Sequence, residues 1–158
     1  MAFTIAPASQ HDMPVVARLF DAYVEALGID LGFQDFETER ATLPGKYAPP
    51  NGIILLARDL QGEAIGCVAL RPIPPEGCCE MKRLYVSPVA RGLGLGRALV
   101  DAVIAEAQRI GYREMKLDTL PHMHAALSLY KETGFTSIDR YYDTPLADPV
   151  FLGRTLTA

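Results

Sequence analysis

The residues with the clearest chemical signature form a run of glycines flanked by arginines, Arg91-Gly92-Leu93-Gly94-Leu95-Gly96-Arg97. The run follows an extended apolar segment and leads into the helical pattern of residues 98–110. Glycines let the backbone approach a ligand closely, and a helix start presents unpaired N–H groups and the positive end of its dipole to an anion. The run therefore predicts a binding site for a phosphate-bearing cofactor.

The spacing of these glycines distinguishes between the known phosphate-binding patterns. The dinucleotide fingerprint needs glycine at its sixth position, but counted from Gly92 that position is Arg97, and counted from the next glycine it is a leucine. The P-loop needs a lysine after its last glycine, and no lysine follows any glycine of the run. What remains is Arg-x-x-Gly-x-Gly, carried by Arg91, Gly94 and Gly96. A flexible surface turn is the alternative, but without a ligand it would cost backbone entropy and weaken the helix start.

At this point the chain resembles the GNAT superfamily of acyl-CoA N-acyltransferases, whose pyrophosphate loop reads Gln/Arg-x-x-Gly-x-Gly/Ala. A second segment, residues 126–135, is similar to the family's Ala-x-x-Leu-Tyr-x-x-x-Gly-Phe pattern. The similarity is strongest from Glu80 to Phe135. It implies acetyl-CoA (coenzyme A) as co-substrate, no metal, and direct attack on the thioester by a primary amine of a small molecule or peptide. It also allows a homodimer, because paired subunits are common in the family.

The resemblance also implies the fold class, an α/β (α+β mixed sheet) architecture of GNAT type. Its central sheet is mostly antiparallel, contains one splayed parallel strand pair and is flanked by helices. The apolar and turn patterns agree with this order. They predict strands over residues 3–6, 52–58, 63–70, 78–86, 114–119 and 150–156, and helices over 13–27, 35–43, 98–110 and 123–133. The strands at 78–86 and 114–119 should form a parallel pair joined by a right-handed crossover.

The resemblance assigns the cofactor to the end of one strand and the glycine run that follows it. The implied cofactor-binding residues are Leu84, Tyr85, Val86, Arg91, Gly92, Leu93, Gly94, Leu95, Gly96 and Arg97. Counting back from the first arginine of the run places the backbone N–H that polarises the acyl carbonyl at Leu84. Val86 would pair with the pantetheine arm.

Two side chains could move protons in such a reaction. Glu80 lies four residues before Leu84, so the two-residue period of a strand predicts that both share a face, and its carboxylate could deprotonate the incoming ammonium directly or through water. An equally supported interpretation is that Glu80 only balances the nearby Lys82 and Arg83. Tyr130, in the second segment, would protonate the departing thiolate, because a phenol has a pKa near 10. The alternative is a tyrosine packed against the sheet.

One position departs from the family pattern. The family often carries an asparagine seven residues before the tyrosine, and this chain has Met123 there. The cofactor contact of that asparagine is therefore not expected. The neighbouring His122 and His124 could serve as a base, but a solvated loop role is favoured.

Two other functions compete with acyl transfer. Asp118 ends the strand after the glycine-run helix, where a dinucleotide-dependent oxidoreductase would hold a ribose. The glycine spacing is wrong for that fold, and no second βαβ half is present. A non-catalytic CoA or nucleotide sensor would keep the binding loop without turnover.

Length and composition predict a single domain over residues 1–158, which the resemblance implies is an N-acetyltransferase domain. No apolar run reaches the roughly 18 residues of a membrane span, and the N-terminus lacks a secretory signal pattern, so we expect a cytoplasmic protein with no membrane partner. The net charge of -4 argues against nucleic-acid binding. Three cysteines, two of them adjacent, predict reduced thiols rather than disulfides.

Local charge predicts two further features. A basic patch should surround the glycine run, formed by Lys82, Arg83, Arg91 and Arg97. Acidic and aromatic residues further upstream would suit a cationic amine acceptor, although a solvated helix face explains them equally well. These residues are Asp30, Asp35, Glu37, Glu39, Phe33, Phe36 and Tyr47.

Overall fold

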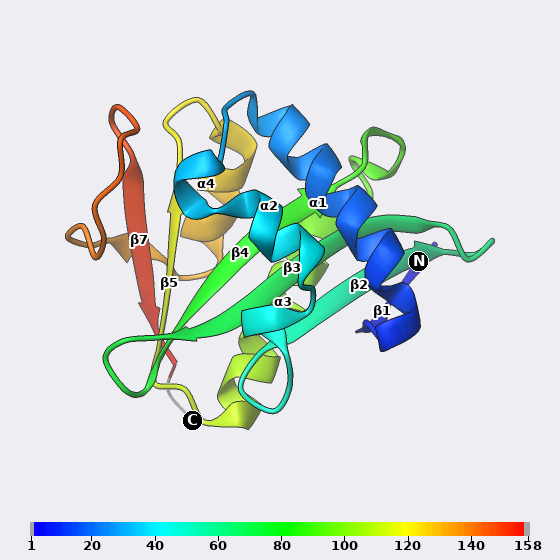
Figure 1. Ribbon diagram of the computed structural model, residues 1–158, viewed down its shortest axis with the longest axis horizontal. Helices are drawn as coiled ribbons and strands as arrows, with labels where there is room; N and C mark the ends of the chain where they lie inside the picture. Colours follow the sequence, from blue (N-terminus) through cyan, green and yellow to red (C-terminus); the bar gives the residue numbers. More distant parts are fainter. Residues whose placement is uncertain (1, 157–158) are drawn as a thin grey trace.

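The computed structural model describes residues 2–156, without the side chain of Phe33, and its centre is a seven-stranded sheet (Figure 1). The strands are β1 (Phe3–Pro7), β2 (Ile53–Asp59), β3 (Ala64–Ile73), β4 (Cys78–Val86), β5 (Glu114–Thr119), β6 (Thr136–Ser137) and β7 (Val150–Thr155). Their order in the sheet is β1-β2-β3-β4-β5-β7-β6. Only β4 and β5 run parallel, and the other neighbours are antiparallel. The predicted mixed sheet is confirmed.

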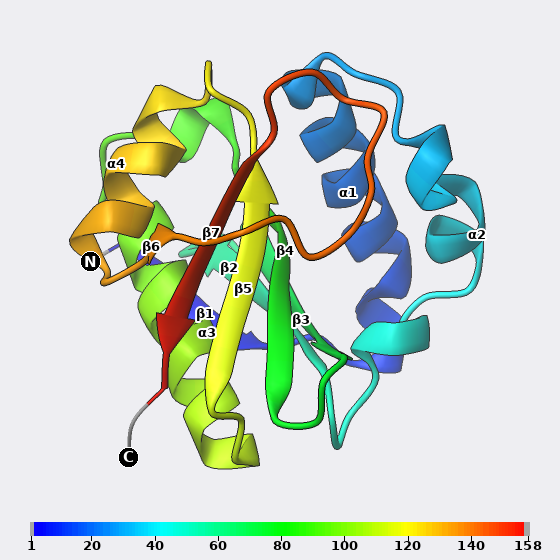
Figure 2. The same ribbon diagram turned by 90° about the vertical axis from the view of Figure 1, so that its left-hand side faces the viewer.

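Helices cover both faces of this sheet. Helices α1 (Met13–Leu27) and α2 (Phe36–Ala41) lie on one side, and α3 (Leu95–Ile110) and α4 (His124–Glu132) lie on the other (Figure 2). Short 3-10 turns precede or connect them, namely η1 (Gln10–Asp12), η2 (Gly32–Gln34), η3 (Gly45–Tyr47) and η4 (Pro88–Ala90). Among the described helices none combines the length and apolar character needed to cross a bilayer.

The two faces of the sheet carry two separate hydrophobic clusters. Leu55 and Ala57 of β2 pack with α3, whereas Ile54 and Leu56 pack with Val16 and its neighbours on α1. A strand that is buried on both faces reads as a continuous apolar run instead of an alternating one. This explains the uninterrupted apolar pattern of β2 and β3 in the sequence.

Most predicted elements are confirmed, with differences at some ends and one additional strand. Strand β3 continues to Ile73, three residues beyond its predicted end. Strands β4 and β5 have the predicted bounds, but α3 begins at Leu95, inside the glycine run. The two-residue strand β6 was not predicted, because a pair of exposed polar residues has no strand pattern. The cysteines are free and buried, and burial raises the pKa of Cys67 to about 12. Cys67 lies in the core cluster between the sheet and α1.

Strand β4 separates from β5 halfway along its length. The pairing with β5 ends at Glu80, opposite Lys116, in the part of the chain that the structure describes. On its other side β4 holds one more residue than β3 between the pairs Cys67–Tyr85 and Ala69–Lys82. This bulge coincides with the positive φ of 60° at Arg83.

The bulge changes which face each side chain of β4 occupies. Glu80 and Lys82 lie opposite Arg71 and Ala69, on the face covered by α1 and α2. Leu84 follows the bulge and packs against the α3 cluster on the other face. The prediction that Glu80 and Leu84 share a face is therefore wrong, because the inserted residue breaks the two-residue period.

Candidate active site

The glycine run forms an open loop at the N-terminus of α3. Gly92 and Gly94 have φ values of 84° and 77°, a left-handed conformation that favours glycine. A Cβ added to either residue would have no atom within 4 Å, so the space above the loop is open. Ala98 donates the first helical hydrogen bond, to the Gly94 carbonyl, and the earlier N–H groups of the helix have no intrahelical acceptor. The loop can therefore offer main-chain donors to an anion.

A groove of about 590 Å³ runs beside this loop, between the end of β4, α4 and the end of α1. Most of the predicted cofactor-binding residues line it, namely Leu84, Tyr85, Val86, Arg91, Gly92, Gly94, Leu95 and Gly96. Leu93 and Arg97 do not line the groove; both are exposed, and Arg97 forms an ion pair with Asp101 at 3.3 Å. The structure thus brings together eight of the ten predicted residues along one groove.

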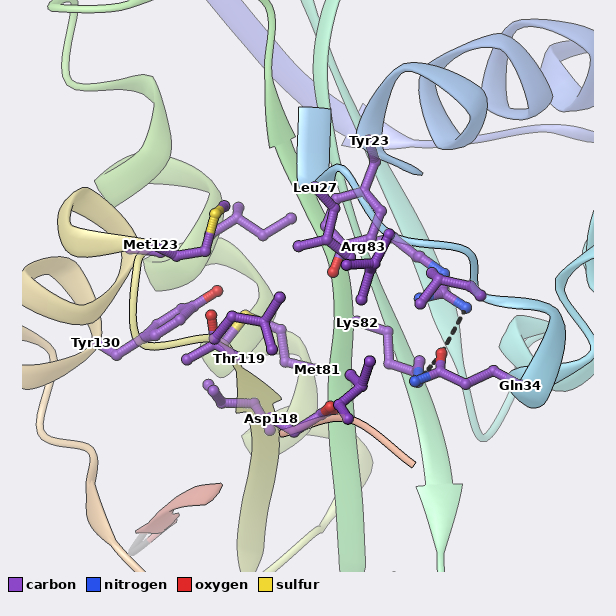
Figure 3. A pocket seen from close by; sticks show the side chains of 17 residues that line it. Tyr23, Leu27, Gln34, Met81, Lys82, Arg83, Asp118, Thr119, Met123 and Tyr130 are labelled. Carbon is purple, nitrogen blue, oxygen red and sulfur yellow. Dashed lines mark hydrogen bonds between the residues drawn. The ribbon is translucent and has the colours of Figure 1, made fainter. Parts of the chain in front are cut away.

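A narrow pocket of about 50 Å³ opens where β4 and β5 diverge (Figure 3). It shares Leu84, Met123 and Ala126 with the groove, together with two residues of α1. The groove and the pocket therefore meet beside Leu84. A group held in the groove can reach a second molecule in the pocket at this junction.

Tyr130 of α4 lines the pocket, and its hydroxyl group lies on the pocket side of the ring in Figure 3. The ring packs edge-on against Phe135, with ring centres 5.8 Å apart. Burial, followed by smaller contributions from Tyr23 and Asp118, raises the pKa of Tyr130. The hydroxyl group therefore keeps its proton at neutral pH, and it is a weaker acid than a free phenol.

Glu80 is 1% exposed and lies outside both the groove and the pocket lining. Its Oε1 accepts a hydrogen bond from Arg71 Nε at 2.8 Å, and its Oε2 accepts one from the Tyr141 hydroxyl at 2.6 Å. Burial alone would raise the pKa of Glu80, but the charges of Lys82 and Arg71 and these hydrogen bonds lower it. Of the two cations predicted to balance Glu80, Lys82 lies 3.8 Å from it, whereas Arg83 pairs with Glu39 instead. The role of Glu80 as proton acceptor stays a prediction.

Arg83 points away from the glycine loop toward α2. Its guanidinium donates two hydrogen bonds of 2.9 Å to Glu39 and lies over the rings of Tyr23 and Phe36. Lys82 also points to this side. The predicted basic patch around the glycine run is therefore wrong. Of its four predicted members, the exposed Arg91 and Arg97 belong to the loop, and Lys82 and Arg83 do not.

The upstream acids predicted to attract a cationic amine are engaged locally. Glu39 is paired with Arg83, Asp35 accepts a hydrogen bond from the Thr38 hydroxyl at 2.9 Å, and Asp30 accepts one from the Gly32 N–H at 2.8 Å. Tyr47 lies in the core against Phe20. These contacts favour the structural interpretation of this segment over the binding of a cation.

Apart from Tyr130, sequence reasoning missed the polar residues that line the pocket, among them Asp118, Lys82 and Gln34. Asp118, at the end of β5, accepts a hydrogen bond of 2.6 Å from the Tyr142 hydroxyl. Lys82 lines the pocket and donates to Gln34 Oε1 at 3.2 Å. The sequence suggests Asp118 only as a ribose ligand of an oxidoreductase. No spacing in the sequence links it to Lys82 or Gln34. The signal that could have found them is the splay of β4 from β5.

A model described as the acetyltransferase (GNAT) family matches residues 16–135 of the chain. An uncharacterized N-acetyltransferase of Schizosaccharomyces pombe is 45% identical over 141 residues, which cover 89% of this chain and 86% of that protein. A GNAT-family acetyltransferase structure from Staphylococcus aureus has a TM-score of 0.82 and 20% identity, covering 99% of this chain and 100% of the other. A Salmonella typhimurium structure with acetyl-CoA as its cofactor has a TM-score of 0.71 and 22% identity, covering 99% and 95%.

Proposed function

Because the chain belongs to the GNAT family of acetyltransferases, we propose that it transfers the acetyl group of acetyl-CoA to a primary amine of a small molecule or a peptide. The observation that carries this proposal is the junction at Leu84. There a groove beside the glycine run opens into a pocket between the diverging strands. Such a junction lets two molecules react while each is held by a different part of the chain.

In this proposal the glycine loop binds the diphosphate of acetyl-CoA. The first-turn N–H groups and the dipole of α3 favour negative charge, and Arg91 adds a cation at the groove wall. The open space above Gly92 and Gly94 lets the phosphates approach the main chain. The free edge of β4 beyond Glu80 supports pairing of the pantetheine arm with Val86, because β5 no longer occupies that edge.

The reaction would proceed by direct attack, without an acyl-enzyme. The bound co-substrate supplies an acetyl thioester, and the Leu84 N–H would donate a hydrogen bond to its carbonyl oxygen and stabilise the developing negative charge. The amine nitrogen attacks the carbonyl carbon, so that a C–N bond forms and the C–S bond breaks. Tyr130 would give its phenolic proton to the thiolate and recover one from the ammonium through solvent. The second ammonium proton is released.

The first deprotonation of the ammonium needs a carboxylate or water near the pocket. Glu80 was predicted for this role, and its contacts with Arg71 and Tyr141 support action through a water rather than by direct contact. Asp118 is the carboxylate on the pocket wall. The pH dependence of kcat/KM should be measured for Glu80→Gln and Asp118→Asn. The variant whose profile loses the fall in activity at low pH identifies the residue that accepts the proton.

The proposed function is tested by two measurements on the purified chain. Calorimetry should detect binding of acetyl-CoA, and a thiol-reactive dye should detect free CoA when amines are added. Binding without thiol release from a broad amine panel would favour a non-catalytic sensor. A folded protein that binds no acetyl-CoA would overturn the proposal.

A further inference from the structure

We propose that the acetyl acceptor is a zwitterion, a free α-amino acid, whose carboxylate binds at Lys82 and whose ammonium binds at Asp118. This inference rests on the proposed function and narrows it to one class of amine. It follows from the charged side chains around the pocket. Some of these side chains are joined in close ion pairs, and others are not.

The other charged side chains around the pocket neutralise one another in close pairs. Arg83 and Glu39 are joined by two hydrogen bonds of 2.9 Å, and Arg71 contacts Glu80 at 2.8 Å. In each pair the cationic group and the carboxylate cancel at short range. These ion pairs form part of the walls of the site, but they offer little net charge that could bind a charged ligand.

Lys82 is the cation that these pairs leave over. It is 9% exposed and lines the pocket. Within the described residues its ammonium forms one hydrogen bond, to Gln34 at 3.2 Å, and the nearest carboxylate oxygen, on Glu80, lies at 3.8 Å. An ammonium carries three donors, and a buried cation without close partners is costly. Burial accordingly lowers the pKa of Lys82, although the charges of Glu80 and, more weakly, Asp118 oppose this. A ligand carboxylate would supply the missing acceptors.

Asp118 is the matching anion on the opposite strand. Its carboxylate accepts a hydrogen bond from the neutral Tyr142 hydroxyl, and no lysine or arginine of the described residues pairs with it. It lies on the pocket wall with Leu84 and Tyr130, where an attacking amine has to arrive. An ammonium group of the acceptor would neutralise the carboxylate of Asp118.

An opposite pair of unmatched charges selects against other amines. A diamine would bring a second cation toward Lys82, and a peptide N-terminus carries an amide in place of the neighbouring carboxylate. Both would leave Lys82 without a ligand carboxylate. Several of the other lining residues are apolar, among them Leu27, Leu31, Leu120 and Leu146. These walls favour an amino acid with an apolar side chain.

The test compares matched acceptors on the wild-type chain with acetyl-CoA, using release of free CoA as the readout. L-leucine and L-methionine are each compared with their carboxamide and with the amine that lacks the carboxyl group. We expect kcat/KM for the amino acid to exceed that for its carboxamide by at least about tenfold, because the carboxamide cannot replace a charged hydrogen-bond acceptor. Equal or better activity with the carboxamides would overturn the inference while leaving the acetyltransferase intact. Absence of thiol release from every amine would instead overturn the proposed function.

Lys82→Met tests the residue itself, with Lys131→Met on the exposed side of α4 as the matched control. The Lys82 variant should bring the amino acid to carboxamide ratio close to one, and the control should keep the wild-type ratio. A retained preference in Lys82→Met would contradict the assignment. If that variant does not fold, calorimetry of the wild type with N-acetyl-leucine and its amide decides: tighter binding of the acid supports the inference, and equal binding overturns it.

Discussion

The proposed cofactor and acceptor halves of the site differ in the groups that form them. The cofactor half consists of main-chain groups from one continuous stretch, from the end of β4 through the glycine loop to the first turn of α3. The proposed acceptor half consists of charged and polar side chains that come from five separate segments and meet only after folding, namely Gln34, Glu39, Arg71, Lys82 and Asp118. Main-chain binding therefore depends on local conformation, whereas the acceptor half depends on ion pairs between distant parts of the chain.

The comparison is tested most strongly at Gly94. Gly94→Glu should weaken acetyl-CoA binding by at least about 1000-fold, because a carboxylate near the diphosphate costs about 4 kcal/mol at 4 Å in a partly shielded site. The measurement is calorimetric titration with acetyl-CoA.

Gly62→Glu provides the matched control for this variant. Gly62 has a φ of 83° and nothing within 4 Å of its added Cβ, but it lies in the turn between β2 and β3. Both substitutions therefore impose a similar backbone strain, and only one adds charge at the loop. If both variants lose affinity equally, the glycine loop is not the phosphate site.

The acceptor half can be destabilised by a substitution that leaves the glycine loop unchanged. Glu39→Gln leaves the Arg83 cation, whose side chain is 2% exposed, without its carboxylate. We expect the free energy of unfolding to fall by about 3 kcal/mol, as for other broken buried pairs. Urea denaturation measures this loss, and affinity for acetyl-CoA should stay unchanged.

Asp21→Asn is the control for a broken ion pair at the surface. Its partner is Arg40, and the two side chains are 46% and 45% exposed. Exposed pairs contribute about 1 kcal/mol or less. A loss in Glu39→Gln no larger than that in Asp21→Asn would show that burial does not strengthen the charges of the acceptor half.

Tyr130 stands where the two halves meet. Tyr130→Phe removes only the hydroxyl group and should lower kcat about 100-fold, because proton transfer by a positioned group contributes at least that much. Affinity for acetyl-CoA should change little. Tyr112→Phe is the control, since the Tyr112 hydroxyl donates to the Asn51 carbonyl away from the pocket. Unchanged turnover in Tyr130→Phe would remove this residue from the proposed mechanism.

The glycine loop and the groove residues beside it could be predicted from the sequence because their signal is local, and their role in binding the cofactor stays a prediction. The spacing from Arg91 to Gly96 and the apolar pattern of α3 both lie within one helix and its preceding loop. The start of α3 was placed three residues too late, because glycine has a low helix propensity and hides the first turn. The acyltransferase family was also predictable, since its motifs lie in continuous segments.

The acceptor half could not be predicted, for two physical reasons. A single inserted residue at Arg83 reverses the faces of β4, and no residue type in that segment marks a bulge. The partners of Glu80 and Asp118, Tyr141 and Tyr142, lie between β6 and β7 and reach the pocket only through tertiary structure. Contacts of such long sequence separation leave no periodic pattern in the sequence.

The smallest predicted effect concerns pH and tests whether Glu80 is held by its ion pairs. Its pKa in the folded chain is below the ordinary value of 4.5, so the unfolded chain binds more protons between these two values. The contribution of Glu80 to stability is therefore fully present above pH 4.5 and is lost as the pH falls through the folded pKa. Glu80→Gln should be less stable than the wild type near neutral pH, and the gap should narrow in acid, as measured by urea denaturation across this range. The same comparison with Glu132→Gln, on the exposed surface of α4, is the control. A gap that stays constant for Glu80→Gln would mean that its contacts depend on shape rather than on charge.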